Sequence, residues 1–434
     1  MIWRAFWWGL APEIWWRFDG QAGVCALYQG KRGPGMQVLE CDIVIAGGGV
    51  AGLAAAAAFG SAGFRVICAD PAPPVTQADA PGADLRTTAF LQPALRVLEA
   101  AGLWPALAPH AAALHVMRLV EAGQGGEDAR LSCDFNAADL SDQPFGYNLP
   151  NWLLRREMVT RLGQLPNVTF LPGVSVLGML ARSSGAQVRL SNGGRVRADL
   201  VIGADGRNSP LRQAAGIGVT TLRYGQKALT FAVTHPIPHQ NVSIETHLSG
   251  GPFTLVPLPD RLGQPSSAVV WMEPGAEALR LHALDTESFE QAMSERSCHV
   301  LGPLRLASQR GLWPIITQIA DRFDAPRLAL IAEAAHVVPP IGAQGLNMSL
   351  ADTAALLELA QQHRATLGSD AMLAAYNRRR WPDVKARVTG IDLLNRTAMA
   401  GGAGLRDLRA RALGMMHGVV PLRKTLMRAG LGLR

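Results

Sequence analysis

The chain has 434 residues, of which 48% are hydrophobic and only 17% charged, and this balance excludes a disordered chain and a charged coiled coil. The length allows two or three domains with sizeable cores, so a globular enzyme is the default expectation. The net charge is +7, and the segment after Ala400 carries seven Arg and Lys residues against the single Asp407. Charge confined to one segment favours one basic contact element over a broad nucleic-acid surface, and no nucleic-acid partner is expected.

The cysteines give no sign of a metal centre. They are odd in number, widely scattered and never spaced C-x-x-C. This pattern supports neither a disulfide framework nor a zinc site, and it fits a reducing, cytoplasmic environment. The five are Cys25, Cys41, Cys68, Cys133 and Cys298.

Residues 1–37 are an N-terminal extension of doubtful structure. Half of the ten tryptophans lie within the first 16 positions, in a stretch that charged residues and Pro12 interrupt. The stretch is too short and too charged for a transmembrane helix, and it lacks the clean apolar core of a secretory signal. An interfacial aromatic anchor and a non-native extension upstream of a start at Met36 remain, and we favour the second.

The segment from 41 to 70 has the strongest local pattern. An apolar run at 41–46 predicts a strand, the glycine-rich turn 47–52 follows, an alanine-rich stretch to Gly63 predicts a helix, and 64–70 predicts a second strand. This is the context that a dinucleotide-binding G-x-G-x-x-G turn requires. Asp70 ends the second strand, where a carboxylate accepts hydrogen bonds from an adenosine ribose.

Each glycine of the turn has a physical role. Gly47 allows the tight turn, Gly49 lets a pyrophosphate approach, and Gly52 lets the helix pack closely on the strand. The backbone N–H groups at the helix start, at Val50 and Ala51, offer free donors and the positive end of the helix dipole to the phosphates.

The rest of the chain predicts an α/β fold with an inserted sheet. Leucines at helical spacing predict a helix over 84–102, and short alternating runs between 114 and 260 predict an antiparallel sheet. Buried-type strands at 198–203 and 328–332 return to the first domain, and an apolar helix follows over 346–360. The expected division is a Rossmann-like nucleotide-binding domain at 38–113, 150–220 and 310–365, a substrate-binding sheet domain at 114–149 and 221–309, and C-terminal helices with the basic tail at 366–434.

Three ordered motifs carry a resemblance to a known family. They are the glycine turn, Ala204-Asp205-Gly206-Arg207-Asn208-Ser209, and the run from Ala332-Glu333-Ala334-Ala335-His336 through Pro339-Pro340 to Gly345-Leu346-Asn347. Together they resemble the FAD-dependent aromatic hydroxylases, which are single-component flavoprotein monooxygenases, over about residues 38 to 400. The Gln344–Asn347 string, the basic tail and the length are most similar to the ubiquinone-biosynthesis hydroxylases.

The resemblance implies FAD as the cofactor and NADPH or NADH as the reductant. It implies that Asp205 and Gly206 serve the flavin pyrophosphate and transient nicotinamide-nucleotide binding, and that Glu333 serves the ribityl chain of FAD. Glu333 stands where the family has Asp, and Ala332 where it has Gly. The longer carboxylate predicts a displaced or water-bridged contact.

The loop after the third motif is expected to form the floor of the reaction chamber. Backbone N–H groups of Gly345, Leu346 and Asn347 at a helix start would stabilise negative charge on the reduced flavin. The resemblance implies that the carbonyl of Pro340 faces the substrate ring, and Pro gives a rigid turn there. His336 is either a pH-sensitive group near the flavin or a buried structural histidine, and the sequence leaves both open.

Further cofactor contacts are implied on either side of the second strand. Arg86 resembles the family arginine that reaches the flavin phosphate or ring. Arg155 precedes a helix and would serve FAD similarly, although the sequence does not separate it from Arg156. Val174 stands where relatives contact adenine through backbone atoms.

The implied reaction is the hydroxylation of a polyprenylated phenol in ubiquinone biosynthesis. NAD(P)H reduces FAD, the reduced flavin captures O2 as a C4a-hydroperoxide, and the terminal oxygen passes to the phenolic ring. The protein excludes water and positions the ring, in a pocket shaped by the inserted sheet, with Phe231, Phe253, Leu255 and Trp271 as candidate lining residues.

The basic tail, residues 404–434, has two interpretations. Leu, Met and Val alternate with arginines, which suits an anionic face of the inner membrane or other quinone-biosynthesis proteins. The alternative is an amphipathic segment packed on the body of the protein. Gly414, Gly418 and Pro421 argue against one continuous helix in either case.

Three other functions stay open at this point. They are hydroxylation of a soluble aromatic acid, reduction of isoprenoid chains by a flavoenzyme, and a non-catalytic FAD-binding scaffold of a quinone-biosynthesis complex. A hydroxylase of an aromatic acid would need a buried cation to bind the substrate carboxylate. The Pro-Pro-x-Gly loop is a poor match for an isoprenoid reductase, and a scaffold would consume no NAD(P)H.

Overall fold

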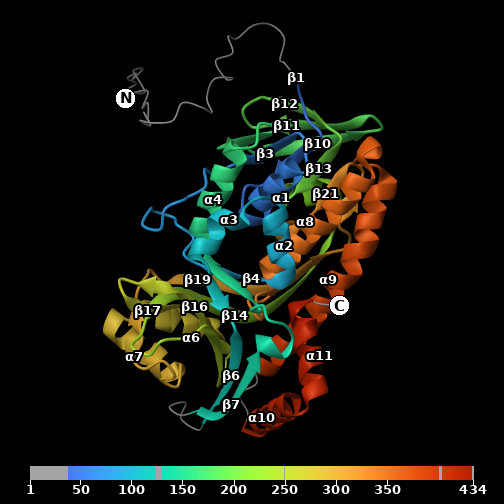
Figure 1. Cartoon of the computed structure of the whole chain (residues 1–434). Helices are drawn as coiled ribbons and strands as arrows, with labels where there is room; N and C mark the ends of the chain where they lie inside the picture. Colours follow the sequence, from blue (N-terminus) through green and yellow to red (C-terminus); the bar gives the residue numbers. More distant parts are fainter. Residues whose placement is uncertain (1–37, 124–128, 249, 400–402, 433–434) are drawn as a thin grey trace, which may run out of the picture. The chain divides into compact units, whose positions relative to one another are not determined.

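The computed structural model describes residues 38–123, 129–248, 250–399 and 403–432 (Figure 1). The interpretations of residues 1–37 therefore lie outside the described residues. Within the described part the chain builds two larger sheets, two smaller ones and the helices that cover them.

A six-stranded sheet of order β20-β21-β13-β2-β3-β9 forms the centre of the nucleotide-binding part. Its strands from β21 to β9 are parallel, and β20 adds an antiparallel edge. The inner strands are continuous apolar runs because helices cover the sheet and exclude water. The bounds are β2 (Ile43–Ala46), β3 (Val66–Asp70), β9 (Val168–Pro172), β13 (Leu200–Gly203), β20 (Asp324–Ala325) and β21 (Leu328–Leu330).

The helix α1 (Val50–Ser61) links β2 to β3 and is buried along most of its length. Its small side chains, Ala54 to Ala58, are almost fully inaccessible, so α4 (Asn151–Gly163) and α8 (Gln344–Gln362) pack closely against it. An alanine-rich sequence thus reflects a helix packed on several sides rather than an amphipathic surface helix.

The predicted helix over 84–102 is wrong in its first half. Residues Thr87–Leu91 form strand β4, and the helix α2 spans only Gln92–Ala100. Two β-branched threonines and Phe90 favour the strand, and Pro93 suits a helix start at that point. β4 pairs with β8 (Gly146–Pro150), which pairs with β5 (Ala112–Leu114), in a three-stranded sheet that connects the two parts of the fold.

The short strands near residue 188 do not belong to the inserted sheet. They form a separate sheet of order β1-β12-β11-β10 beside the nucleotide-binding sheet. Because β12 ends at Ala198 and β13 starts at Leu200, this segment stays with the nucleotide-binding part. The bounds are β1 (Val38–Glu40), β10 (Val176–Arg182), β11 (Gly185–Leu190) and β12 (Arg195–Ala198).

The second large sheet has the order β22-β19-β14-β17-β16-β15-β6-β7, with β18 paired to β14. Its pairs are antiparallel except for β15 with β6. The bounds are β6 (Val116–Ala122), β7 (Ala129–Asn136), β14 (Val219–Thr234), β15 (Val242–His247), β16 (Pro252–Arg261), β17 (Gln264–Pro274), β18 (Arg305–Leu306), β19 (Gly311–Ala320) and β22 (His336–Val337).

Helices α6 (Gly275–Ala283) and α7 (Thr286–Arg296) cover one face of this sheet (Figure 1). The core between them is aromatic, with Phe231 5.1 Å and Trp271 6.0 Å from the ring of Phe289. The four residues expected to line a substrate pocket are all in this closed core, no more than 3% exposed. That expectation is wrong because the alternation of the strands turns these side chains to the helix-covered face.

The C-terminal part is helical. After α8, the long helix α9 (Asp370–Met399) runs beside it, and α10 (Ala403–Gly418) and α11 (Val420–Leu431) follow. The helix interruption expected at Gly418 and Pro421 is confirmed. No helix among the described residues is both long enough and apolar enough to span a membrane.

Candidate functional site

The glycine turn between β2 and α1 has the backbone that its sequence predicts. Gly47 has φ +109°, and a Cβ there would overlap the carbonyl oxygen of Ala204. A Cβ on Gly52 would overlap the carbonyl oxygen of Gly47, whereas a Cβ on Gly49 would meet open space. Gly47 and Gly52 are thus required by packing, and the space above Gly49, beside the α1 start at Val50 and Ala51, is free for a phosphate group.

Asp70 lies directly beside this turn. Its Oδ2 accepts a hydrogen bond from the backbone N–H of Gly48 at 2.5 Å, and its Oδ1 accepts one from Ala72 N at 2.8 Å. Val174 follows β9 and donates its backbone N–H to the carbonyl oxygen of Asp70 at 2.9 Å. The residues predicted for the ribose and the adenine are therefore neighbours at the carboxyl end of β3.

The second motif lies at the carboxyl end of β13, next to the turn. Ala204 N donates to the carbonyl oxygen of Ala46 at 2.8 Å, which joins the two motifs. The Oδ2 of Asp205 accepts from Leu211 N at 3.1 Å, while its Oδ1 is buried without a hydrogen-bond partner. Gly206 follows with φ +83°. A buried carboxylate oxygen without a partner is expensive, so it fits a site that a polar ligand completes.

Arg86 and Arg155 meet at one buried carboxylate. Arg86 donates to both oxygens of Asp84 at 2.8 and 2.7 Å, and Arg155 Nη2 lies 3.7 Å from Asp84 Oδ2. Burial raises the pKa of Asp84, but the hydrogen-bonded Arg86 and its other neighbours outweigh burial, so the pKa lies below its usual value. Asn151 Nδ2 also donates to Asp84, at 3.1 Å.

The structure separates the two candidate arginines at the start of α4. Arg155 turns to Asp84, and its Nε is buried without a hydrogen-bond partner. Arg156 instead donates to Glu157 at 2.7 Å and stacks 5.4 Å from the Trp152 ring centroid. Of these two arginines, Arg155 is the one beside the cluster around Asp84, and its unpartnered Nε fits an anionic group there.

The charge of Glu333 acts on Arg86 as well. Burial lowers the pKa of Arg86, but Asp84 and the charge of Glu333 outweigh it, so its pKa lies above the usual value. Glu333 itself is exposed, on a short 3₁₀ turn at Ala332–Ala334. The Arg86 guanidinium also lies 4.3 Å from the ring centroid of Trp313 on β19. Arg86 therefore interacts with Asp84, with the charge of Glu333 in the third motif and with Trp313 of the second sheet.

His336 is fully buried in an ion-pair network behind the third motif. Its Nε2 lies 2.7 Å from Asp352 Oδ2, and the other oxygen of Asp352 accepts from Arg380 Nε at 2.8 Å. Burial raises the pKa of Asp352, but His336 and Arg380 outweigh it, and the net pKa lies below the usual value. Ala332 N also points to Asp352, at 3.3 Å. This environment is that of a positioning residue, and His336 is 1% exposed.

The loop after His336 ends at the start of α8. Pro340 is exposed, and Gly342 and Ala343 both have left-handed backbones, with φ +61° and +56°. A Cβ on Gly345 would meet open space, so the helix start at Gly345 and Leu346 is accessible to a ligand. The positive end of a 19-residue helix thus points out of the loop.

Asn347 has a structural task that the motif did not reveal. Its Oδ1 accepts from Leu91 N at 2.8 Å, and its Nδ2 donates to the carbonyl oxygens of Ala89 at 2.7 Å and Ala343 at 2.6 Å. The side chain therefore ties strand β4 to the start of α8. Its backbone N–H stays at the helix start where the flavin contact is predicted.

Sequence reasoning missed the partners of the predicted residues. Asp84 and Asn151 order the two arginines, Asp352 and Arg380 hold His336, and Trp313 lies against Arg86. Asp84 stands two residues before Arg86, which is a local signal, but the other partners are distant in sequence. Among the described residues no group of three His, Cys, Asp or Glu side chains is placed to hold a metal ion.

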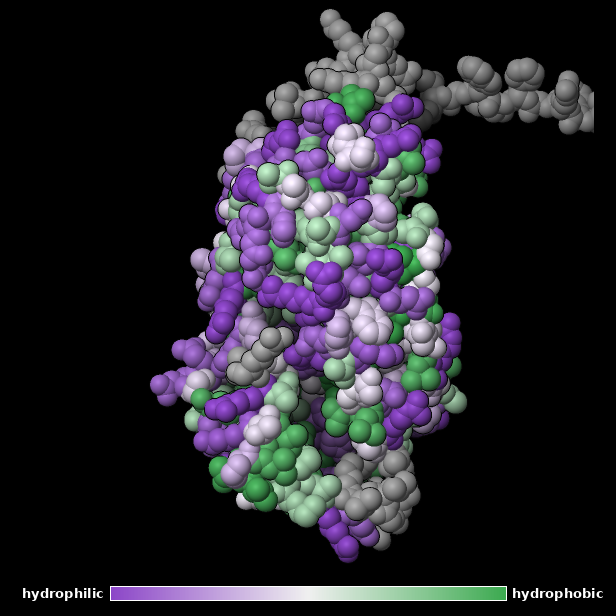
Figure 2. All heavy atoms as spheres, turned by 90° about the vertical axis from the view of Figure 1, so that its right-hand side faces the viewer, coloured by the Kyte–Doolittle hydropathy of each residue, from purple (hydrophilic) through white to green (hydrophobic). Residues whose placement is uncertain are grey.

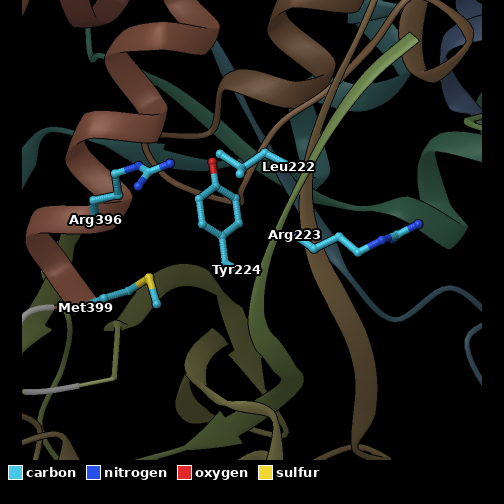
Figure 3. Close-up of a pocket in the computed structure, with 5 residues that line it drawn as sticks. All are labelled: Leu222, Arg223, Tyr224, Arg396 and Met399. Carbon is cyan, nitrogen blue, oxygen red and sulfur yellow. The ribbon is translucent and has the colours of Figure 1, made fainter.

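Two cavities are found in the described part of the chain, one apart from this site and one at its second motif. One of about 360 Å³ lies between β14 and α9 (Figure 3), where Leu222 and Tyr224 point toward the helix and Arg223 points away. The Tyr224 hydroxyl is 2.7 Å from both Thr317 Oγ1 and Asp392 Oδ1, and burial raises its pKa to about 12. The other, of about 400 Å³, adjoins the second motif and includes Arg207 and Arg212 in its lining.

Together these features define a dinucleotide-cofactor enzyme. The site residues include a tight glycine turn, the carboxylate of Asp70 beside it, an arginine pair at Asp84 and a second accessible helix start at Gly345. A family model described as an FAD binding domain matches residues 40–390. The chain belongs to this family and is an FAD-dependent oxidoreductase of the aromatic-hydroxylase type.

Relatives agree with this assignment, and a solved structure agrees with the fold. The ubiquinone hydroxylase UbiL of Rhodospirillum rubrum is 34% identical over 90% of this chain and 89% of its own length. The 3-demethoxyubiquinol 3-hydroxylase of Escherichia coli is 28% identical over 90% of this chain and 98% of its own. The crystal structure of p-nitrophenol 4-monooxygenase from Pseudomonas putida covers 92% of this chain and 100% of its own, with a TM-score of 0.74 at 19% identity, and is similar in fold.

Proposed function

We propose that this protein hydroxylates the aromatic ring of a polyprenylated phenol in ubiquinone biosynthesis, with FAD, NAD(P)H and O2. The observation that carries the proposal is similarity along nearly the whole chain to ubiquinone hydroxylases, together with the match to an FAD binding domain over residues 40–390. FAD, when bound, takes a hydride from NAD(P)H and delivers one oxygen atom of O2 to the ring.

Residues at the first two motifs would hold the nucleotide end of FAD. In this proposal the α1 start at Val50 and Ala51 binds the pyrophosphate over Gly49, because donors and dipole favour an anion there. Asp70 accepts hydrogen bonds from the ribose, and the backbone of Val174 lies along the adenine. The free Oδ1 of Asp205 and the free Nε of Arg155 complete the polar contacts.

Residues of the third motif would surround the flavin ring. The N–H groups of Gly345, Leu346 and Asn347 hold negative charge at the ring's pyrimidine edge, and Glu333 binds the ribityl chain. The Pro340 carbonyl faces the substrate, and His336 keeps the loop in place through Asp352. Trp313 and the half-buried side chains of the second sheet exclude water from the reacting atoms.

The C-terminal helices would bring the protein to its lipid-like substrate. On α9 to α11 seven large apolar side chains are exposed, from Leu426 at 39% to Met415 at 68%. Figure 2 views this side and displays hydrophobic groups among hydrophilic ones. Exposed Arg396, Arg411 and Arg428 accompany them. Apolar side chains with basic neighbours suit the anionic surface of a membrane.

The experiment that tests the function is a quinone profile. Isoprenoid quinones and their precursors are measured by mass spectrometry in a source strain without this gene and in the same strain complemented with it. Accumulation of a prenylated phenol that lacks one ring hydroxyl, reversed by the gene, supports the proposal and identifies the carbon. An unchanged profile, with phenol-dependent NAD(P)H consumption by the purified protein, would favour a different aromatic substrate.

A further inference from the structure

A buried Glu–His pair lies on strand β15. His247 Nε2 is 2.9 Å from Glu245 Oε1, and the two side chains are 14% and 9% exposed. His247 Nδ1 is buried and has no hydrogen-bond partner among the described residues. Buried polar atoms normally have a hydrogen-bond partner, so the unpartnered Nδ1 indicates that this pair has a role other than stabilising the fold.

The pair lies on the face of the sheet opposite α6 and α7. Successive side chains of a strand point to opposite faces, and Ile244 lies in the core under α6 and α7. Glu245 and His247 therefore point to the other face. On that face Leu119, beside Glu245, packs against the cluster of Cys133, Phe135, Leu413 and Met427, and Val270 packs against the core of the nucleotide-binding part. Thr230 Oγ1 accepts from Trp313 Nε1 at 3.1 Å. Trp313 in turn lies against Arg86 of the cofactor site.

Glu245 is the charged member of a row across the sheet. Strand register puts Leu119, Glu245, Thr254, Val270 and Thr230 side by side on β6, β15, β16, β17 and β14. The other four are half-buried, although their neighbours on the helix-covered face are almost fully buried. A partly accessible strip of small and apolar side chains with one carboxylate suits an aromatic ring that has an apolar substituent and one hydroxyl.

The strip is joined to the predicted flavin end through hydrogen bonds. Asn347 at the start of α8 holds β4, and β4 pairs with β8. Asn148 of β8 donates to the Pro257 carbonyl oxygen of β16 at 2.9 Å. β16 pairs directly with β15. The carboxylate and the helix start are thus fixed in one hydrogen-bonded framework.

We propose that Glu245, oriented by His247, accepts a hydrogen bond from the substrate's phenolic hydroxyl and takes its proton during hydroxylation. This assignment rests on the proposed function. As the ring carbon forms its bond to the incoming oxygen atom, electron density leaves the hydroxyl oxygen. The O–H bond breaks, its electron pair stays on the substrate oxygen, and the proton bonds to the Glu245 carboxylate. A phenol has a pKa of about 10, so its hydroxyl is not ionised at neutral pH, and this transfer accompanies, rather than precedes, the electron donation.

Ligand binding tests the hydrogen bond without turnover. The oxidised holoenzyme is titrated with 2-prenylphenol and with its methyl ether, which cannot donate. We expect the wild type to prefer the phenol about tenfold, as for a hydrogen bond to a charged group, and Glu245→Gln to prefer it about twofold. Glu273→Gln is the matched control, because Glu273 is a buried carboxylate of the same sheet on the helix-covered face, where it accepts from Trp271 Nε1 at 2.8 Å. Its preference should equal that of the wild type.

Turnover tests the proton transfer. At pH 7 we expect Glu245→Gln to form hydroxylated product about a hundredfold more slowly, with NAD(P)H oxidation continuing without product. The rate of product formation by the variant should rise toward pH 10, where the phenol ionises without a base, and that of the wild type should rise far less. Among the described residues, the titratable neighbours of Glu245 in the strand register are His247 on its own strand and Glu121, which pairs with His247 from β6, so His247→Gln is compared for the same pH response.

The outcomes separate this assignment from the function it rests on. Equal phenol preference and equal pH profiles in Glu245→Gln and the wild type would overturn the role of Glu245 and leave the function standing. A wild type that neither binds nor hydroxylates the phenol would overturn both. If Glu245→Gln does not retain flavin, the same two measurements on His247→Gln decide, and an unchanged phenol preference there contradicts the proposal.

Discussion

At the scale of single residues, the backbone of Ala332 has a conformation that alanine rarely adopts. It is 6% exposed and has φ +55°, a left-handed backbone that glycine adopts without strain. The sequence comparison with the family already indicated glycine at this place. The resemblance could identify the substitution, but only the backbone angle explains why it matters.

Replacing Ala332 by Gly should stabilise the protein slightly. A left-handed alanine costs about 1–2 kcal/mol, which exceeds the roughly 0.5–1 kcal/mol of extra chain entropy that glycine loses on folding. We expect the free energy of unfolding to rise by about 0.5 kcal/mol in urea denaturation of the holoenzyme. Ala334→Gly, at a buried position without a positive φ, is the control and should lower it. A loss of stability in Ala332→Gly would contradict the strain argument.

Asp352 should govern part of the acid stability. Because its folded-state pKa lies below the unfolded value, it contributes stability above about pH 4, the unfolded pKa, and this contribution is lost as the pH falls through the folded pKa. Asp352→Asn leaves His336 and Arg380 without their partner, and the expected cost at pH 7 is about 3–5 kcal/mol.

The measurement is thermal unfolding of both proteins from pH 7 to pH 3. The difference in melting temperature should shrink toward the acid end, because the wild type loses the ion pairs that the variant lacks. A difference that stays constant over this range would show that the charge of Asp352 is not what stabilises the loop.

At the scale of elements, two glycines of the turn between β2 and α1 have different roles, one in packing and one in ligand binding. Gly52 lies where a Cβ would overlap the Gly47 carbonyl, and Gly49 lies where a Cβ would meet open space. The spacing of the motif predicted both roles from the sequence. The sequence predicted the surrounding strands and helix for the same reason, because local periodicity and turn chemistry define them.

Alanine at the two positions should give opposite results. Gly52→Ala forces α1 away from β2, so we expect a strongly destabilised or unfolded protein. Gly49→Ala should fold with a far-UV circular dichroism spectrum like that of the wild type, because Gly49 has an extended backbone with φ −66°. Its bound flavin, measured by visible absorbance after desalting, should fall at least tenfold, since the methyl group occupies the space of the pyrophosphate. Full flavin content in Gly49→Ala would exclude the proposed phosphate position.

Strand β4 illustrates where element prediction failed. Leucines at 91, 95 and 98 have helical spacing, yet Leu91 ends a strand. The strand exists because Asn347, more than 250 positions away, binds its backbone, and because β8 pairs with it. Such a long-range partner leaves no periodic signal near residue 90.

At the scale of the whole molecule, the C-terminal helices both pack and remain exposed. Leu413 and Met427 are buried against Cys133 and Phe135 of β7. Gln344, at the start of α8, donates a hydrogen bond to the carbonyl oxygen of Gly430 at 2.9 Å. The same helices leave Met415 and other apolar side chains exposed. The packed interpretation therefore holds for the inner side of these helices, and membrane contact stays a proposal for the exposed side.

Membrane contact can be tested on the exposed side alone. The double substitution Met415→Glu and Leu422→Glu changes side chains that are 68% and 41% exposed, so thermal stability should stay within about 0.5 kcal/mol of the wild type. Binding to vesicles with phosphatidylglycerol, measured by sedimentation, should fall at least tenfold. Leu262→Glu, at a 98% exposed leucine of the β16–β17 turn, is the matched control and should bind as before. Equal binding by all three proteins would exclude these helices as the contact.

The sequence by itself determined the cofactor and the class of enzyme. The glycine turn, Asp70 and the two later motifs are local patterns, and local patterns follow from turn geometry and helix starts that a few neighbouring residues specify. Tertiary structure decided everything that depends on distant partners. It separated Arg155 from Arg156, enclosed His336 with Asp352, buried Trp271 in a closed core and placed Glu245 on the face of its sheet opposite α6 and α7. The reason is physical: which face of a strand is buried, and which charge meets which, depend on packing between segments that are far apart in the chain.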